Sequence, residues 1–277
     1  MAARIVSVVL VFVVTVLVSG PLNVLVYAKG LAFTLGPAGV AAHVPAIALM
    51  VALLGLVLVK LRKLSKRAAG FELDARALAL GSLAMVATAL WLVIFVAVMG
   101  ALLGSPLQRS ANAISPGALA LAAVSFIASS LVQQLSTQSF VRAASPNEEI
   151  SRGGVAVGVV IFTLAHAGVT PSAIYLCNVA LFGLATTLLF TMGDGRRAPS
   201  YAIATGMHAG WNFAQIALLG APFGGFANPV AVWRWPSAPA ILVGGSNGFD
   251  EGVLFSLACL PFVLLGVAGV RRAAARA

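Results

Sequence analysis

Long runs of apolar residues, separated by short segments rich in charge, glycine or proline, dominate the chain. A helix needs about 20 apolar residues to cross the hydrocarbon core of a bilayer, so these runs have the length of membrane spans, the fifth being short. The pattern predicts an all-α, polytopic transmembrane helical bundle of about eight spans. The expected spans are Ile5–Tyr27, Ala42–Val59, Ala77–Gly104, Pro116–Val141, Val155–Val169, Pro171–Met192, Ser200–Leu219 and Val253–Val270.

Composition and charge agree with this pattern. Hydrophobic residues make up 61% and charged residues 9% of the chain, and the mean hydropathy is +1.04, which excludes an ordinary soluble domain. If the N-terminus is cytoplasmic, only Lys29, Arg109 and Arg234 of the 17 basic residues fall on the outer side. Because basic residues are retained in the cytoplasm, we expect a multi-pass plasma-membrane protein with both termini cytoplasmic. The net charge of +10 then reflects topology and lipid contact, and no nucleic-acid partner is expected.

The chain shows no soluble domain. We therefore expect one membrane domain over residues 1–277, with N-terminal spans in residues 1–110 and a core over residues 117–270.

Two of the three histidines lie well inside predicted spans, where an unpaired polar side chain costs several kcal/mol and often has a function, whereas His43 lies at the outer edge of the second span. His166 ends the segment Phe-x-x-x-His in the fifth span, and His208 begins His-x-x-x-Asn in the seventh, which puts Asn212 one turn away on the same face. Gly206 and Gly210 predict a close approach of another helix beside His208. Neutral imidazoles suit zinc, and an amide can hold an oxyanion or a ligand water, so we expect a metal or proton site.

A hydrolytic metal site usually also needs a carboxylate, and two of the seven acidic residues lie just ahead of the fifth span. Glu148 and Glu149 are followed by Arg152, and then by the two histidine motifs. In this order the motifs resemble the CPBP family (CAAX prenyl protease and bacteriocin-processing, or Abi) of intramembrane metalloproteases. The resemblance covers about residues 117–265, including the glycine-rich segment Leu242–Gly252.

The resemblance implies a metallo-endopeptidase that cleaves a membrane-associated peptide or protein at or within the bilayer. A divalent metal, with zinc expected, would polarise a water molecule that a glutamate deprotonates. The implied residues are His166 and His208 as metal ligands, Glu148 or Glu149 as the base, Arg152 orienting the carboxylates, Asn212 assisting, and Phe162 one turn below His166.

A second alignment of the same motifs is also open. In a continuous helix Glu149 would lie roughly 25 Å from His166, too far to share a metal, unless glycines at the start of the fifth span break that helix. The end of the fourth span offers Thr137 and Gln138 at the glutamate positions instead. The chain would then be a non-catalytic relative, acting as a membrane binding, immunity or scaffold protein. Its polar stripe would be Ser130, Gln134 and Gln138, at i, i+4 spacing.

Overall fold

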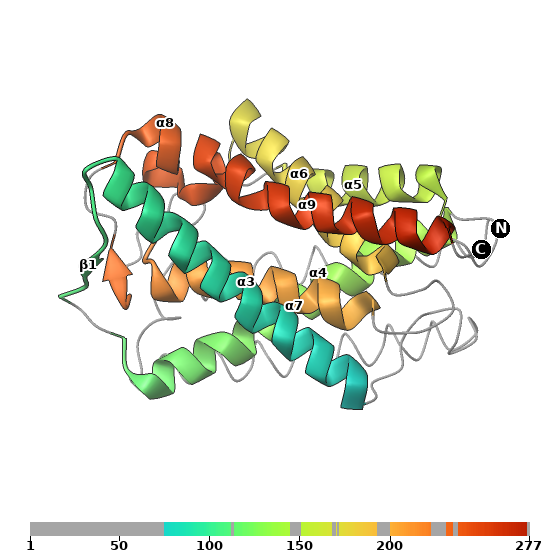
Figure 1. Ribbon diagram of the computed structural model, residues 1–277, viewed down its shortest axis with the longest axis horizontal. Helices are drawn as coiled ribbons and strands as arrows, with labels where there is room; N and C mark the ends of the chain where they lie inside the picture. The colour runs from blue at the N-terminus through green and yellow to red at the C-terminus, as the bar shows by residue number, and fades with distance from the viewer. Residues whose placement is uncertain are drawn as a thin grey trace.

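The fold is a bundle of helices (Figure 1), seen in a computed structural model that describes residues 75–111, 114–144, 151–167, 170, 172–192, 200–222, 231–234 and 238–275. The first two predicted spans lie outside these residues. Four of the described helices, α3, α4, α6 and α9, are long and apolar enough to cross a membrane, and α5 is a shorter apolar helix. By length and composition, these helices indicate a multi-pass membrane protein.

The six predicted spans that fall in the described part of the chain are all helical. The predicted seventh span is one helical rod whose last part is a π-helix, η2, and the short segments before α9 are single turns. The bounds are α3 (Ala75–Leu102), α4 (Pro116–Ala143), α5 (Arg152–His166), α6 (Ala173–Met192), α7 (Ser200–Asn212), η2 (Phe213–Leu218), α8 (Ala240–Val243), η3 (Gly245–Asn247), η4 (Phe249–Glu251) and α9 (Val253–Ala274).

Serines begin three of these helices. The hydroxyl oxygen of Ser115 accepts a hydrogen bond from the backbone N–H of Ala118, and Ser151 and Ser172 cap α5 and α6 in the same way. Each serine satisfies a backbone donor that has no partner inside the helix. Pro116 directly follows its cap, at the helical position where the missing N–H costs nothing.

A small antiparallel pair of strands joins two distant loops. β1 (Gln108–Arg109) pairs with β2 (Trp233–Arg234), with Gln108 opposite Arg234 and Arg109 opposite Trp233. The side chain of Arg234 also donates to the hydroxyl oxygen of Ser110 at 3.3 Å. The connection after η2 is therefore tied to the connection after α3.

Helix α7 is central to the bundle, since it packs against α3, α4 and α6, and α3 runs diagonally across it in Figure 1. Gly206 and Gly210 form the contact with α3. A Cβ atom at either position would lie far inside van der Waals contact with the backbone oxygen of Gly81 or Met85, respectively. The predicted close helix approach is therefore confirmed.

The predicted position of that approach relative to His208 is wrong. Residues two positions apart along a helix point about 200° apart. His208 is two positions from both Gly206 and Gly210, so it points away from the face that carries them. Its ring contacts Phe162 of α5 and Phe182 of α6. The glycine face of α7 thus packs against α3, while the opposite face, with His208, contacts α5 and α6.

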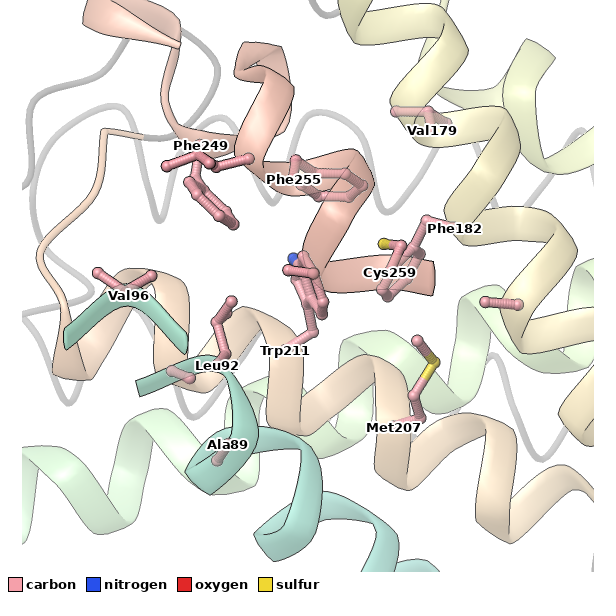
Figure 2. Packing of buried hydrophobic residues seen from close by; sticks show 14 of the residues in the cluster. Ala89, Leu92, Val96, Val179, Phe182, Met207, Trp211, Phe249, Phe255 and Cys259 are labelled. Carbon is pink, nitrogen blue, oxygen red and sulfur yellow. The ribbon is translucent and has the colours of Figure 1, made fainter. Parts of the chain in front are cut away.

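The apolar core surrounds Trp211, which is only 1% exposed (Figure 2). Its ring packs against Phe182, Phe255 and Phe249, with centroids 5.3, 4.7 and 6.2 Å away. Its indole N–H donates to the side-chain oxygen of Gln215, 2.9 Å away in the π-helix. A π-helical turn is rare and is often found beside a functional site.

Candidate functional site

His166 lies at the end of α5, where its Nδ1 is 2.7 Å from the backbone oxygen of Phe162, one turn earlier. The imidazole stacks on the Phe162 ring, with centroids 4.5 Å apart. That ring in turn lies over Gly183 of α6, where a Cβ atom would be only 3.0 Å from it. The orientation of His166 is therefore fixed from two sides, by its own helix and by a buried aromatic ring.

His208 lies in the middle of α7 and is 3% exposed. Its Nδ1 is 3.1 Å from the amide nitrogen of Gln134 on α4. The amide oxygen of Gln134 accepts from the amide nitrogen of Gln138, at 2.9 Å, and that nitrogen also lies 3.5 Å from the hydroxyl of Thr187 on α6. Three helices thus supply one buried chain of polar side chains that ends on the imidazole.

Phe162 joins the two histidines. The centroid of its ring is 5.7 Å from that of His208 and 4.5 Å from that of His166. Phe182 contacts the other side of the site, 5.1 Å from His208. The structure therefore brings His166, His208, Phe162, Gln134 and Gln138 together.

The other predicted site residues lie elsewhere. Arg152 is exposed at the first residue of α5, roughly 20 Å along the helix from His166, and α5 has no break between them. Thr137 is buried on α4 beside Gln138. Asn212 is half-buried, and its side chain forms no hydrogen bond with another described residue. Glu148 and Glu149 lie outside the described residues.

The site contains polar atoms without partners. The hydroxyl of Ser130, one turn from Gln134, and that of Thr205, one turn from His208, are buried and have no hydrogen-bond partner in the part of the chain that the structure describes, and the same holds for the amide oxygen of Gln138. A buried polar atom left unpaired costs about 1–3 kcal/mol. Such atoms beside a polar chain suit a site that takes a polar ligand or solvent.

No acidic side chain of the described residues belongs to this site. The two described acids, Asp250 and Glu251, lie in η4, at the start of α9. A run of aromatic contacts, from Phe249 through Trp211 and Phe182, leads from this turn to His208. Within the described part of the chain, the histidine site is therefore neutral.

Hydrogen-bond partners decide whether the imidazoles fit a metal. A carbonyl oxygen only accepts, so Nδ1 of His166 carries the proton and its Nε2 has a free lone pair, as a metal ligand requires. An amide nitrogen only donates, so Nδ1 of His208 accepts and its Nε2 carries the proton. No group of three metal-binding side chains occurs among the described residues. These residues alone therefore do not fit zinc, which usually takes three protein ligands in a catalytic site.

A second polar cluster surrounds the backbone at the start of α9. The amide nitrogen of Asn178, on α6, donates to the backbone oxygens of Asp250 and Gly252, and Ser256 donates to its amide oxygen. Burial raises the pKa of the Asp250 carboxyl to about 6. Asp250 is thus an acid that exchanges its proton nearer to neutral pH than a free carboxyl does.

Sequence reasoning missed several residues of these clusters, which are Thr187, Phe182, Thr205, Asn178, Ser256 and Gln215. Thr187 and Phe182 belong to an apolar span without a recognisable pattern, and only the packing of α6 against α5 and α7 brings them to the histidines. Gln215 carried a signal, because it is a polar residue inside an apolar span, seven residues after His208.

Fold and site together define a helical membrane protein with a buried imidazole–amide site at its centre. Comparison of the chain with protein-family models, with curated proteins and with solved structures finds no match in any of the three. The resemblance to the CPBP family therefore stays a prediction from the motifs.

Proposed function

We propose that this chain is a non-hydrolytic relative of the CPBP metalloproteases, which binds a membrane-associated peptide or protein through the imidazole–amide site. The observation that carries the proposal is the hydrogen-bond chain from Gln138 through Gln134 to His208. A hydrolase needs a base at this point to take a proton from water, and an amide cannot act as one near neutral pH. Binding by hydrogen bonds remains within the reach of these side chains.

The hydrogen-bond chain from Gln138 to His208 also favours the second alignment of the motifs, with Thr137 and Gln138 at the glutamate positions. Gln138 is fully buried and lies two hydrogen bonds from His208. Arg152, in contrast, begins a continuous α5 at the end far from His166. In this alignment the segment that contains Glu148 and Glu149 is a connection between two spans.

For the whole chain we propose eight spans in the plasma membrane, with both termini cytoplasmic. The distribution of basic residues supports this topology, since only three of 17 would be external. Two of these three, Arg109 and Arg234, lie on the paired strands β1 and β2 and would therefore share one side of the bundle. Cysteine accessibility at positions 109 and 234, compared with a position in the basic loop that holds Lys63, tests this orientation in intact cells.

A lipid-anchored peptide can test the proposed function. Purified full-length protein in nanodiscs is mixed with a fluorescent peptide that carries a palmitoyl or farnesyl group, with and without zinc. We expect a rise in anisotropy that does not need zinc, that is weakened in His208→Ala, and that leaves the peptide mass unchanged. Product masses that require zinc and disappear in His208→Ala would refute the proposal. The absence of any binding to either peptide would equally count against it.

A metallo-endopeptidase is the second candidate. The position of the proton on the His166 imidazole favours it. Its Nδ1 donates to a backbone carbonyl, which leaves Nε2 ready to bind a metal, and Glu148 or Glu149 would have to supply the missing carboxylate. Metal analysis of the purified wild type, His166→Ala and His208→Ala tests this candidate. Zinc at one equivalent in the wild type and absent from both variants would support it, whereas a wild type that takes up no zinc on titration would exclude it.

A further inference from the structure

The two imidazoles differ in which nitrogen carries the proton. Nδ1 of His166 faces a carbonyl oxygen at 2.7 Å and must donate, so its Nε2 accepts. Nδ1 of His208 faces the amide nitrogen of Gln134 at 3.1 Å and must accept, so its Nε2 donates. The site therefore offers one hydrogen-bond acceptor and one donor, held on rings that both contact Phe162.

The amide chain sets the state of His208. Gln134 could present either its nitrogen or its oxygen to the imidazole, because an amide can turn by 180°. In the structure its oxygen accepts from the amide nitrogen of Gln138, at 2.9 Å, and its nitrogen faces His208. Both glutamines are fully buried, and no solvent contact competes with this arrangement. Gln134 and Gln138 are thus positioning residues, which act on the ligand through His208.

A secondary amide matches this pair of rings. Its carbonyl oxygen accepts and its N–H donates, whereas a divalent metal would need a lone pair on both nitrogens. Neither Nε2 has a hydrogen-bond partner among the described residues. Ser130 and Thr205, one turn from Gln134 and His208, add buried hydroxyls that no other described residue pairs with. The neutral surroundings also suit a neutral group, because a charged ligand would lose its hydration without a counter-charge.

We propose that His166 and His208 together bind one secondary amide group of a peptide. His208 Nε2–H donates to the amide oxygen, His166 Nε2 accepts from the amide N–H, and Gln134 and Gln138 hold His208 in the donating state. This inference rests on the proposed function and names the chemical group that the site recognises.

The protonation states can be measured directly. The chain has three histidines, so nitrogen NMR of full-length protein in nanodiscs, labelled at the imidazole nitrogens, gives few signals, which single His→Gln variants assign. In the wild type we expect the proton on Nε2 of His208 and on Nδ1 of His166. A proton on Nδ1 of His208 would overturn the inference. This result does not depend on peptide binding, so failure of the lipid-anchored peptide to bind would refute the proposed function and leave the role of Gln134 intact.

Two matched probes test the ligand. N-methyl-4-methylpentanamide has a single amide, which carries an N–H, and the matching N,N-dimethylamide has a single amide without an N–H. The first is expected to shift both Nε2 signals, and the second to leave His166 unchanged and to bind about five- to ten-fold more weakly. Equal effects of the two probes, or no shift with either, would overturn the assignment of an amide ligand.

Gln134→Glu should reverse the state of His208. A carboxylate only accepts, so Nδ1 of His208 would carry the proton and both Nε2 atoms would have free lone pairs. We expect the NMR pattern to switch, the amide probe to weaken, and zinc to bind about ten- to 100-fold more tightly than in the wild type. Gln133→Glu is the matched control, since it adds a carboxylate to the neighbouring position of α4. A switch in the control, or none in Gln134→Glu, would refute the positioning role.

Discussion

The contact between α3 and α7 should fail when a methyl group is added to its glycines. In Gly206→Ala the new Cβ atom would meet the backbone oxygen of Gly81, and in Gly210→Ala that of Met85. Carbon and oxygen atoms normally approach to about 3.3–3.6 Å, and each new atom would be about 1 Å or more inside that limit. Because the partner is backbone in both cases, no side chain can rotate away, and the two helices must separate.

The cost follows from this geometry. Overpacking a well-packed interior usually costs about 1–3 kcal/mol, and a clash between two backbones belongs at the upper end, so we expect about 3 kcal/mol for each variant. The double variant should cost clearly less than twice that, because helices that have already separated can accept the second methyl group. Separation would also disturb Leu92 and Trp211, which pack in the core shared by the two helices (Figure 2).

Unfolding of purified protein in mixed micelles, followed by tryptophan fluorescence during an SDS titration, measures these free energies. Gly153→Ala is the matched control, since this exposed glycine in α5 has only the hydroxyl of Ser151, 3.7 Å away, near its added methyl group. Alanine favours a helix over glycine, so the control should lose no stability and can gain up to about 1 kcal/mol. Gly206→Ala as stable as the wild type, within about 0.5 kcal/mol, would refute the packing argument.

Two further predictions concern the polar clusters. Gln134→Leu and His208→Leu should each cost about 1–3 kcal/mol in the same assay, and the double variant should cost less than their sum, since each single change leaves a buried partner unpaired; strict additivity would mean that the two side chains do not interact. The pKa of Asp250 is raised in the fold to about 6, so the folded state holds the proton more tightly than the unfolded state. Stability should be highest below about pH 4 and fall by about 3 kcal/mol as the pH rises through 6, and Asp250→Asn should remove this difference.

Much of the helical fold could be predicted because apolar run length is a local property. A run of about 20 apolar residues can satisfy its backbone in lipid only as a helix, and this rule found α3, α4, α6 and α9. The π-helix of η2 could not be found in this way. Its residues belong to an apolar run, and the hydrogen bond from Trp211 to Gln215 joins residues four apart, a spacing that also fits an ordinary α-helix.

The candidate site could be predicted in part, from polar residues in apolar spans. Helical spacing put Gln134 and Gln138 on one face of α4, but only the packing of three helices decides that this face meets His208. The direction of Gly206 relative to His208 could have been predicted, since side chains two positions apart on a helix point about 200° apart. The spacing of the motif could also have favoured the second alignment from the sequence alone. Three residues separate Gln138 from Arg142, as in Glu-Glu-x-x-x-Arg, whereas only two lie between Glu149 and Arg152.

The amide of Gln138, at the end of the hydrogen-bond chain that reaches His208, affects both the stability and the chemistry of the site. A buried carboxylate in this apolar interior would lose its hydration and would require a metal or a basic side chain beside it, and none of the described residues around His208 is a cation. An amide has no such requirement, because it is neutral: the nitrogen of Gln138 donates to Gln134 and Thr187, and only its amide oxygen has no partner among the described residues. The same neutrality removes the ability to take a proton from water. In the proposed function, stability without a counter-charge and loss of hydrolysis would have one physical cause, and selective hydrogen bonding would be the function left to the site.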